Sequence, residues 1–188
     1  MSQQELLKKL AACLESNSIP SMMTGSIASS VHGEPRSTHD IDDLVQINKT
    51  DITKLRAAFP APRYYMDQVD AEQAIDERTM FNLIDSLEGD TVDFWLLTDE
   101  PFDRSRFARR KAEEIFGTRL SVSSSEDTII TKLRWAILSG GSEKQFGDAL
   151  HVYEVQHQSL DFGYLEQWVA ALELSDLWER LQGEAQAL

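Results

Sequence analysis

Three acidic residues stand at the start of an otherwise apolar strand pattern. Asp40, Asp42 and Asp43 precede a run whose apolar, β-branched content predicts a strand from residue 41 to 47. Because side chains alternate across a strand, Asp40 and Asp42 point to one face and Asp43 to the other. Like charges this close repel each other, so the pair on one face needs a positive partner.

A third acid interrupts a later strand pattern at residues 91–97, where Asp93 lies among bulky apolar side chains. A lone carboxylate is costly to bury there without a partner. This strand is predicted to form a hairpin with residues 80–85 through a turn at Gly89, beside the strand at 41–47. Three carboxylates would then converge, and Mg²⁺, in a site of two ions, is the cation that such oxygen ligands typically bind.

Gly25 and Ser26 lie between a short strand pattern and a short helix pattern that ends at Gly33. Glycine permits a close backbone approach, and backbone N–H groups with the Ser26 hydroxyl can hold phosphate oxygens. Alone, an Asp-x-Asp sequence is usually a turn or a solvated strand end, and Gly-Ser is weaker still. Their order along the chain, together with Asp93, favours a nucleotide and metal site.

Strand and helix patterns are mixed over the first ~115 residues, and the remainder is mostly helical. The other expected elements are a helix at 3–16, a helix at 50–59, a basic helix at 101–114, a strand at 117–123 and helices thereafter. The sequence therefore predicts an α+β fold with two parts. Residues 1–120 would form a mixed β-sheet flanked by helices, and residues 121–188 a C-terminal helical subdomain.

The charge of the chain limits its partners. A net charge of −14 argues against broad, nonspecific nucleic-acid binding, although a basic patch exists at residues 104–111. No apolar run approaches the length of a membrane span, and the first residues lack the apolar centre of a signal peptide. With a single cysteine, the chain is expected to be cytoplasmic and without a membrane partner.

Together, the Gly25-Ser26 pair, the acids Asp40 and Asp42 and the later Asp93 resemble the signature of the nucleotidyltransferase superfamily, the DNA polymerase β-like fold. The long gap between the first two motifs, with "GEPRSTHDID" leading into the second, looks more like that of the AbiEii-type toxins. The resemblance implies that Asp40 and Asp42 bind metal. It also implies that Asp93 is a third ligand or the base that deprotonates an acceptor hydroxyl.

The resemblance to AbiEii-type proteins extends into the helical half. They carry a lysine early in a helix and an aspartate in the next helix, which correspond here to Lys132 and Asp148. The resemblance implies that Lys132 contacts nucleotide phosphates and that Asp148 supports the site. From the helical pattern alone, Lys132 lies at the margin of an apolar stripe that includes Ile137 and would be a surface lysine. Asp148 would likewise be an exposed helix acid.

Several residues near the acids keep two interpretations. Arg36 and Thr38 could contact the triphosphate, Arg36 through its bidentate donors, or could belong to an ordinary polar turn. Asp43 stands where relatives usually have an apolar residue; it could lie at a solvated end of the sheet or shift the strand. Trp135 falls on an apolar helix stripe and is predicted to lie in the core, as are two later tryptophans.

The function predicted is that of a Mg²⁺-dependent nucleotidyltransferase that moves NMP from an NTP to a hydroxyl acceptor. By resemblance, the acceptor is a tRNA 3′ end or a protein hydroxyl, and the chain could be a toxin with a cognate antitoxin. One alternative is a catalytically degenerate protein that binds nucleotide or a partner. Another is an enzyme that acts on a small molecule such as an aminoglycoside, for which the acidic pI is suitable.

Overall fold

The computed structural model describes residues 3–35 and 38–186. Within them the chain divides into two compact units, each of which combines segments that are distant in sequence. Unit 1 comprises residues 3–24 and 38–122, and unit 2 comprises residues 25–35 and 123–186. Arg36, one of the candidate phosphate ligands, lies outside the described residues. No helix in the described part of the chain is long and apolar enough to cross a membrane.

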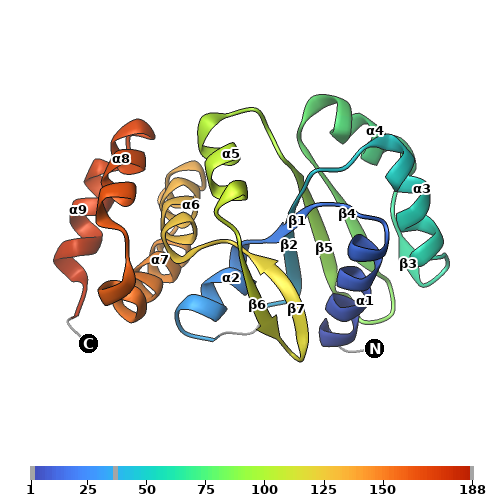
Figure 1. Ribbon diagram of the computed structural model, residues 1–188, viewed down its shortest axis with the longest axis horizontal. Helices are drawn as coiled ribbons and strands as arrows, with labels where there is room; N and C mark the ends of the chain where they lie inside the picture. The colour runs from blue at the N-terminus through green and yellow to red at the C-terminus, as the bar shows by residue number, and fades with distance from the viewer. Residues whose placement is uncertain (1–2, 36–37, 187–188) are drawn as a thin grey trace. The chain divides into compact units, whose positions relative to one another are not determined.

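Unit 1 is built on one mixed β-sheet (Figure 1). Its strands are β1 (Ser21–Met23), β2 (Asp40–Val45), β3 (Tyr64–Tyr65), β4 (Met80–Asp85), β5 (Thr91–Leu96), β6 (Lys111–Ile115) and β7 (Thr118–Val122). Within the described residues they form seven strands in the order β3-β4-β5-β2-β1-β7-β6. The β2–β5 and β1–β7 pairs are parallel, and the other pairs are antiparallel. The predicted hairpin and its place beside the acidic strand are confirmed.

Four helices belong to the described part of unit 1: α1 (Gln3–Ser16), α3 (Lys49–Ala58), α4 (Gln68–Glu77) and α5 (Pro101–Ala108). Side chains cap the N-termini of two of these helices. Asn48 and Asp51 form a reciprocal capping box at the start of α3, and the Asp67 side chain accepts the first amide N–H groups of α4. Figure 1 shows α3 and α4 beside β3 and β4, at one end of the sheet.

The predicted basic helix at 101–114 is wrong in its second half. Helix α5 ends at Ala108, and Lys111–Ile115 form β6, which pairs with β7 as an antiparallel hairpin. Phe116 and Gly117 close that hairpin with positive φ angles of 51° and 73°. Pairing with β7 at the edge of the sheet therefore overrides the local helical pattern, as tertiary context commonly does.

Unit 2 is helical. Its helices are α2 (Gly25–His32), α6 (Ser125–Leu138), α7 (Glu143–Gln156), α8 (Phe162–Ala171) and α9 (Ser175–Glu184), with a 3₁₀ turn, η1 (His157–Ser159). Helix α6 packs along α7, and α2 contacts both. Ser124, Ser142 and Asp161 cap α6, α7 and α8 by accepting backbone N–H groups. The prediction that Trp135 lies in the core and that Ile137 belongs to a buried stripe is wrong, because both side chains are exposed.

Helix α2 is held against α6 and α7 by long-range contacts. His32 Nε2 donates to the Ser123 carbonyl at 2.7 Å, and Gln156 Nε2 donates to the His32 carbonyl at 2.9 Å. Gly33 follows at the closest approach to α7. A Cβ atom there would lie 3.0 Å from the Val152 amide nitrogen and 3.1 Å from the Ser29 carbonyl oxygen. Glycine at this position therefore serves helix packing.

Gly33→Ala is expected to destabilise the protein by about 1–3 kcal/mol, because backbone atoms cannot yield to the added methyl group. The matched control is Gly147→Ala, in the middle of α7, where a Cβ atom meets nothing within 4 Å. That change should leave stability unaltered or raise it by roughly 0.5–1 kcal/mol. Urea unfolding of both variants measures the difference, and equal stabilities would show that the approach of α2 to α7 is not tight.

Candidate active site

The acidic strand and the third acid lie side by side in unit 1. Strand β2 pairs with β5 so that Asp42 stands opposite Asp93, and Asp40 opposite Thr91. Ile41 and Val92, the residues between them, are fully buried. The alternation of strands therefore places Asp40, Asp42 and Asp93 on the more accessible face of the sheet. The structure brings these three predicted site residues together.

Two side chains of β5 hold the carboxylates of β2. The Thr91 hydroxyl donates to Asp40 Oδ1 at 2.8 Å, and the Trp95 indole N–H donates to Asp42 Oδ1 at 3.3 Å. The alternation of β5 places both donors on the same face as Asp93. Sequence reasoning did not identify Thr91 or Trp95 as site residues. The signal that could have found them is their period-two spacing on either side of Asp93.

The carboxylates of Asp40, Asp42 and Asp93 concentrate negative charge on this face of the sheet. Partial burial raises the pKa of Asp93 to about 6, and the charges of Asp42 and Asp40 contribute in the same direction. A bound cation would reverse the effect of the two neighbouring carboxylates, because it favours the ionised form of all three groups. The arrangement is therefore one that a cation would stabilise.

Gly25 and Ser26 begin α2 in unit 2. Gly25 has a positive φ of 57°, in the left-handed region that favours glycine, and its carbonyl oxygen accepts the Ser29 hydroxyl at 3.0 Å. In unit 1, the preceding residue Thr24 donates its backbone N–H to the Asp42 carbonyl at 2.9 Å. The predicted turn of strand, glycine and helix start is thus present.

Lys132 and Asp148 form an ion pair within unit 2. The Lys132 ammonium donates to Asp148 Oδ2 and to Gln145 Oε1, both at 2.8 Å. Lys132 is 3% exposed and Asp148 8% exposed, so the expectation of a surface lysine and an exposed helix acid is wrong. An ammonium group can be buried when it has a charged partner. The helical pattern around Lys132 does not show the partner on the neighbouring helix, and it therefore placed Lys132 at the surface.

Thr38 lies beside the first acid. Its hydroxyl donates to the Asp40 carbonyl oxygen and accepts from the Asp40 backbone N–H, both at 3.2 Å. The basic segment at 104–111 is largely engaged within unit 1. Arg104 pairs with Asp99 and Arg106 with Asp103, in both cases with donor–acceptor distances below 3 Å.

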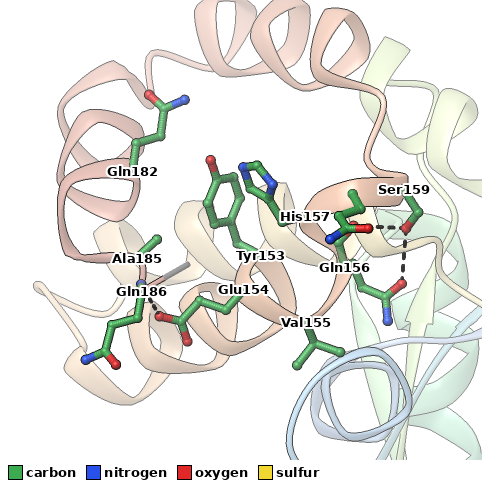
Figure 2. Close-up of a pocket in the computed structure, with 10 residues that line it drawn as sticks. Tyr153, Glu154, Val155, Gln156, His157, Ser159, Gln182, Ala185 and Gln186 are labelled. Carbon is green, nitrogen blue, oxygen red and sulfur yellow. Dashed lines mark hydrogen bonds between the residues drawn. The ribbon is translucent and has the colours of Figure 1, made fainter. Parts of the chain in front are cut away.

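Unit 2 also contains a cavity of about 530 Å³ beside α7, η1 and the end of α9 (Figure 2). None of the predicted site residues within the described ranges lines it. Its polar groups bond to one another: Glu154 Oε1 accepts the Gln186 backbone N–H at 2.8 Å, and the Ser159 hydroxyl donates to the Gln156 carbonyl at 2.9 Å. The cavity therefore presents no set of charged groups comparable to the carboxylates of unit 1.

Known proteins match this chain in structure. No protein-family model matches it, and no curated protein matches its sequence at a significant level. The structure of ANT(2″)-Ia in complex with adenylyl-2″-tobramycin has a TM-score of 0.60 and 16% identity, over 92% of this chain and 98% of its own. An antigenic nucleotidyltransferase-like protein from Paracoccidioides brasiliensis has a TM-score of 0.56 and 19% identity, over 100% and 96% of the two chains.

The lincomycin-bound lincosamide antibiotic adenylyltransferase LnuA has a TM-score of 0.53 and 12% identity, over 82% of this chain and 98% of its own. This chain has the nucleotidyltransferase fold. The predicted α+β class is confirmed, and so is the nucleotidyltransferase-type fold that the sequence resemblance implied. The similarity is one of fold, and the AbiEii-type branch stays a prediction.

The carboxylates of this nucleotidyltransferase fold suit Mg²⁺ by their chemistry. Among residues 3–35 and 38–186, no three His, Cys, Asp or Glu side chains form a group that could hold a metal ion by themselves. Mg²⁺ seldom uses such an all-protein cage; it takes one or two carboxylates and completes its shell with water and substrate phosphates. Asp42 and Asp93, opposite each other on β2 and β5, offer hard oxygen ligands of this kind.

Asp43 is part of the interior of the nucleotidyltransferase fold. Neither a solvated sheet end nor a shifted strand accounts for it, because β2 keeps its register and Asp43 is 0% exposed. The Met22 backbone N–H donates to its Oδ1 at 3.0 Å, while its Oδ2 has no hydrogen-bond partner among the residues that the structure describes. Burial raises the pKa of Asp43 to about 8. The side chain is therefore mostly a neutral acid at pH 7.

The buried Asp43 should make the fold less stable as the pH rises. The pKa of Asp43 is higher in the folded than in the unfolded state. The contribution of its protonated form to the free energy of unfolding is therefore complete below about pH 4 and is lost towards pH 8. Each pH unit in that window should cost about 1 kcal/mol. Asp43→Asn keeps the acceptor for Met22 without titrating. In urea unfolding with chelator, the wild type should lose about 2 kcal/mol more than this variant between pH 5 and 7, and equal losses would contradict the assignment.

Proposed function

We propose that this protein is a Mg²⁺-dependent nucleotidyltransferase that moves NMP from an NTP to a hydroxyl acceptor. The observation that carries the proposal is the set of three carboxylates on one face of adjacent parallel strands, in a chain with the nucleotidyltransferase fold. Such crowding is costly in a protein that only binds a partner, because the charges repel each other unless a cation is bound. This argues against a catalytically degenerate protein.

The reaction assigns a role to each carboxylate. The acceptor oxygen attacks the α-phosphorus of the NTP, a new P–O bond forms, and the bond to the bridging oxygen breaks so that pyrophosphate leaves. Asp40 and Asp42 would hold the metal. Asp93 would accept the hydroxyl proton, or would complete the ligand set while the proton passes to water. When bound, Mg²⁺ supplies positive charge for the hydroxyl and for the leaving group.

Residues outside the acidic strands are proposed to bind the phosphates of the NTP. The backbone of Gly25 and the Ser26 hydroxyl offer donors at the start of α2, where the helix dipole favours anions. Lys132 contributes positive charge, and its ion pair with Asp148 fixes its ammonium group. Arg36 and Thr38, which precede the acidic strand, are proposed to contact the triphosphate.

We propose a small cationic molecule with free hydroxyl groups as the acceptor. The net charge of −14 attracts cations and repels RNA, and two arginines of the basic segment, Arg104 and Arg106, already pair with Asp99 and Asp103. Two structures with the same fold hold small antibiotics or their adenylyl products. A tRNA 3′ end or a protein hydroxyl, with a cognate antitoxin, is the competing proposal and rests on the sequence resemblance alone.

Transfer of label tests the proposal. The protein is incubated with each α-³²P NTP and Mg²⁺, and with tobramycin, lincomycin, tRNA or a cell extract in separate reactions. We expect label on a small acceptor, dependent on Mg²⁺. Label on tRNA or protein would keep the enzyme and replace the acceptor. Mg²⁺-dependent NTP binding without transfer would favour the degenerate alternative, and the absence of both would refute the nucleotidyltransferase proposal.

A further inference from the structure

We infer that Thr91 and Trp95 are positioning residues that fix the two metal-binding carboxylates of β2 in separate orientations. The inference rests on the proposed function of Asp40 and Asp42 as metal ligands. It adds two neutral donors to a site that sequence motifs describe only by its acids. Both donors come from β5, the strand that also carries Asp93.

The register of the sheet gives each carboxylate its own donor. Thr91 is directly opposite Asp40, and its hydroxyl reaches Asp40 Oδ1 at 2.8 Å. Trp95 lies two residues beyond Asp93, the residue opposite Asp42, and its longer side chain reaches back diagonally to Asp42 Oδ1 at 3.3 Å. Diagonal neighbours on one sheet face are within reach of large aromatic side chains. The short Thr91 side chain therefore serves the carboxylate directly opposite it, and the long Trp95 side chain serves the carboxylate that lies diagonally across the strands.

Trp95 is a fixed donor because its ring is packed. It lies against Met22, Leu44 and Phe107, which form a buried cluster in unit 1. An indole can only donate, and only through its one N–H group. The ring position thus determines which oxygen of Asp42 is engaged, and the other oxygen is left to face a cation.

Asp93 lies between the two donors. In the described part of the chain no hydrogen bond holds its carboxylate, in contrast to Asp40 and Asp42. Without their donors, the carboxylates of β2 would turn away from Asp93 to reduce repulsion. Removal of the hydrogen-bonding partner of a metal-ligating carboxylate typically lowers metal affinity by about 10–100-fold. Thr91 and Trp95 should therefore act on cation affinity before any nucleotide binds.

Binding of Mn²⁺ alone, followed by electron paramagnetic resonance of the free ion, tests this inference. Trp95→Phe removes the N–H group and keeps an aromatic ring, and its dissociation constant should rise about tenfold. The matched control is Trp135→Phe, at an exposed tryptophan of unit 2, and this variant should bind Mn²⁺ as the wild type does. Thr91→Val should also weaken binding, whereas Thr91→Ser, which keeps the hydroxyl, should restore it.

A spectroscopic readout tests whether the ion binds beside Trp95. Mn²⁺ quenches nearby indole emission, so titration should quench the wild type and Trp135→Phe but not Trp95→Phe. Circular dichroism and urea unfolding in chelator establish that each variant is folded. Wild-type Mn²⁺ affinity in both folded Trp95→Phe and Thr91→Val would overturn the inference and leave the proposed function intact. No Mn²⁺ binding by the wild type would overturn both.

Discussion

Asp42→Asn is expected to lower nucleotidyl transfer by about 10³-fold while the protein remains folded. The change removes one negative charge from the carboxylates that would hold Mg²⁺, and metal catalysis is worth several kcal/mol of transition-state stabilisation. The asparagine keeps an oxygen that can accept the Trp95 N–H, so the local geometry is preserved. Initial rates with the preferred NTP and acceptor measure the loss.

The same variant should be at least as stable as the wild type in the presence of chelator. Asp42 raises the pKa of Asp93 by repulsion, and a neutral side chain removes that cost. The control is Asp70→Asn, an exposed acid of α4 in the same unit, which should change neither rate nor stability. Full activity in Asp42→Asn would refute its assignment as a metal ligand.

Lys132→Met is expected to destabilise the protein by about 3–5 kcal/mol, because it removes the buried ammonium group that pairs with the buried Asp148 carboxylate. Equilibrium unfolding in urea measures the loss. Lys144→Met, at an exposed position of α7, is the control and should have little effect. A loss in Lys132→Met as small as in the control would show that the ion pair does not hold α6 and α7 together.

The double variant Lys132→Met/Asp148→Leu distinguishes the two roles of the lysine. Removal of both charges should recover much of the lost stability, since buried pairs can often be replaced by apolar groups. It should not recover transfer activity if Lys132 also contacts the phosphates. Recovery of both would restrict Lys132 to the stability of unit 2.

Strand periodicity predicted the face shared by Asp40 and Asp42, because the alternation of side chains depends only on local geometry. The register that sets Asp42 opposite Asp93 depends on how two distant strands pair, and the sequence does not contain it directly. The alternation that places Thr91 and Trp95 on the face of Asp93 is local, but the carboxylate that each of them bonds depends on this register. The protonated state of Asp43 likewise arises from burial in the folded sheet.

Other elements were missed where the local signal was weak or misleading. Helix α4 buries only Ala71 and Ala74, so its apolar periodicity is faint, and the paired strand β3 has only two residues. The second half of the predicted basic helix became β6 through pairing with β7. In these segments the tertiary partner decides the structure, and a single sequence does not identify that partner.

The position of α2 in the chain has a consequence for the order of folding. Residues 25–35 are synthesised early but belong with helices that follow residue 123. The contacts that hold α2, from His32 to Ser123 and to Gln156, join residues 91 and 124 positions apart. Contacts of such long sequence separation slow folding, because the chain loses entropy when it closes the loop before they form. On the ribosome, α2 must therefore wait for α6 and α7 to emerge before its apolar side is covered.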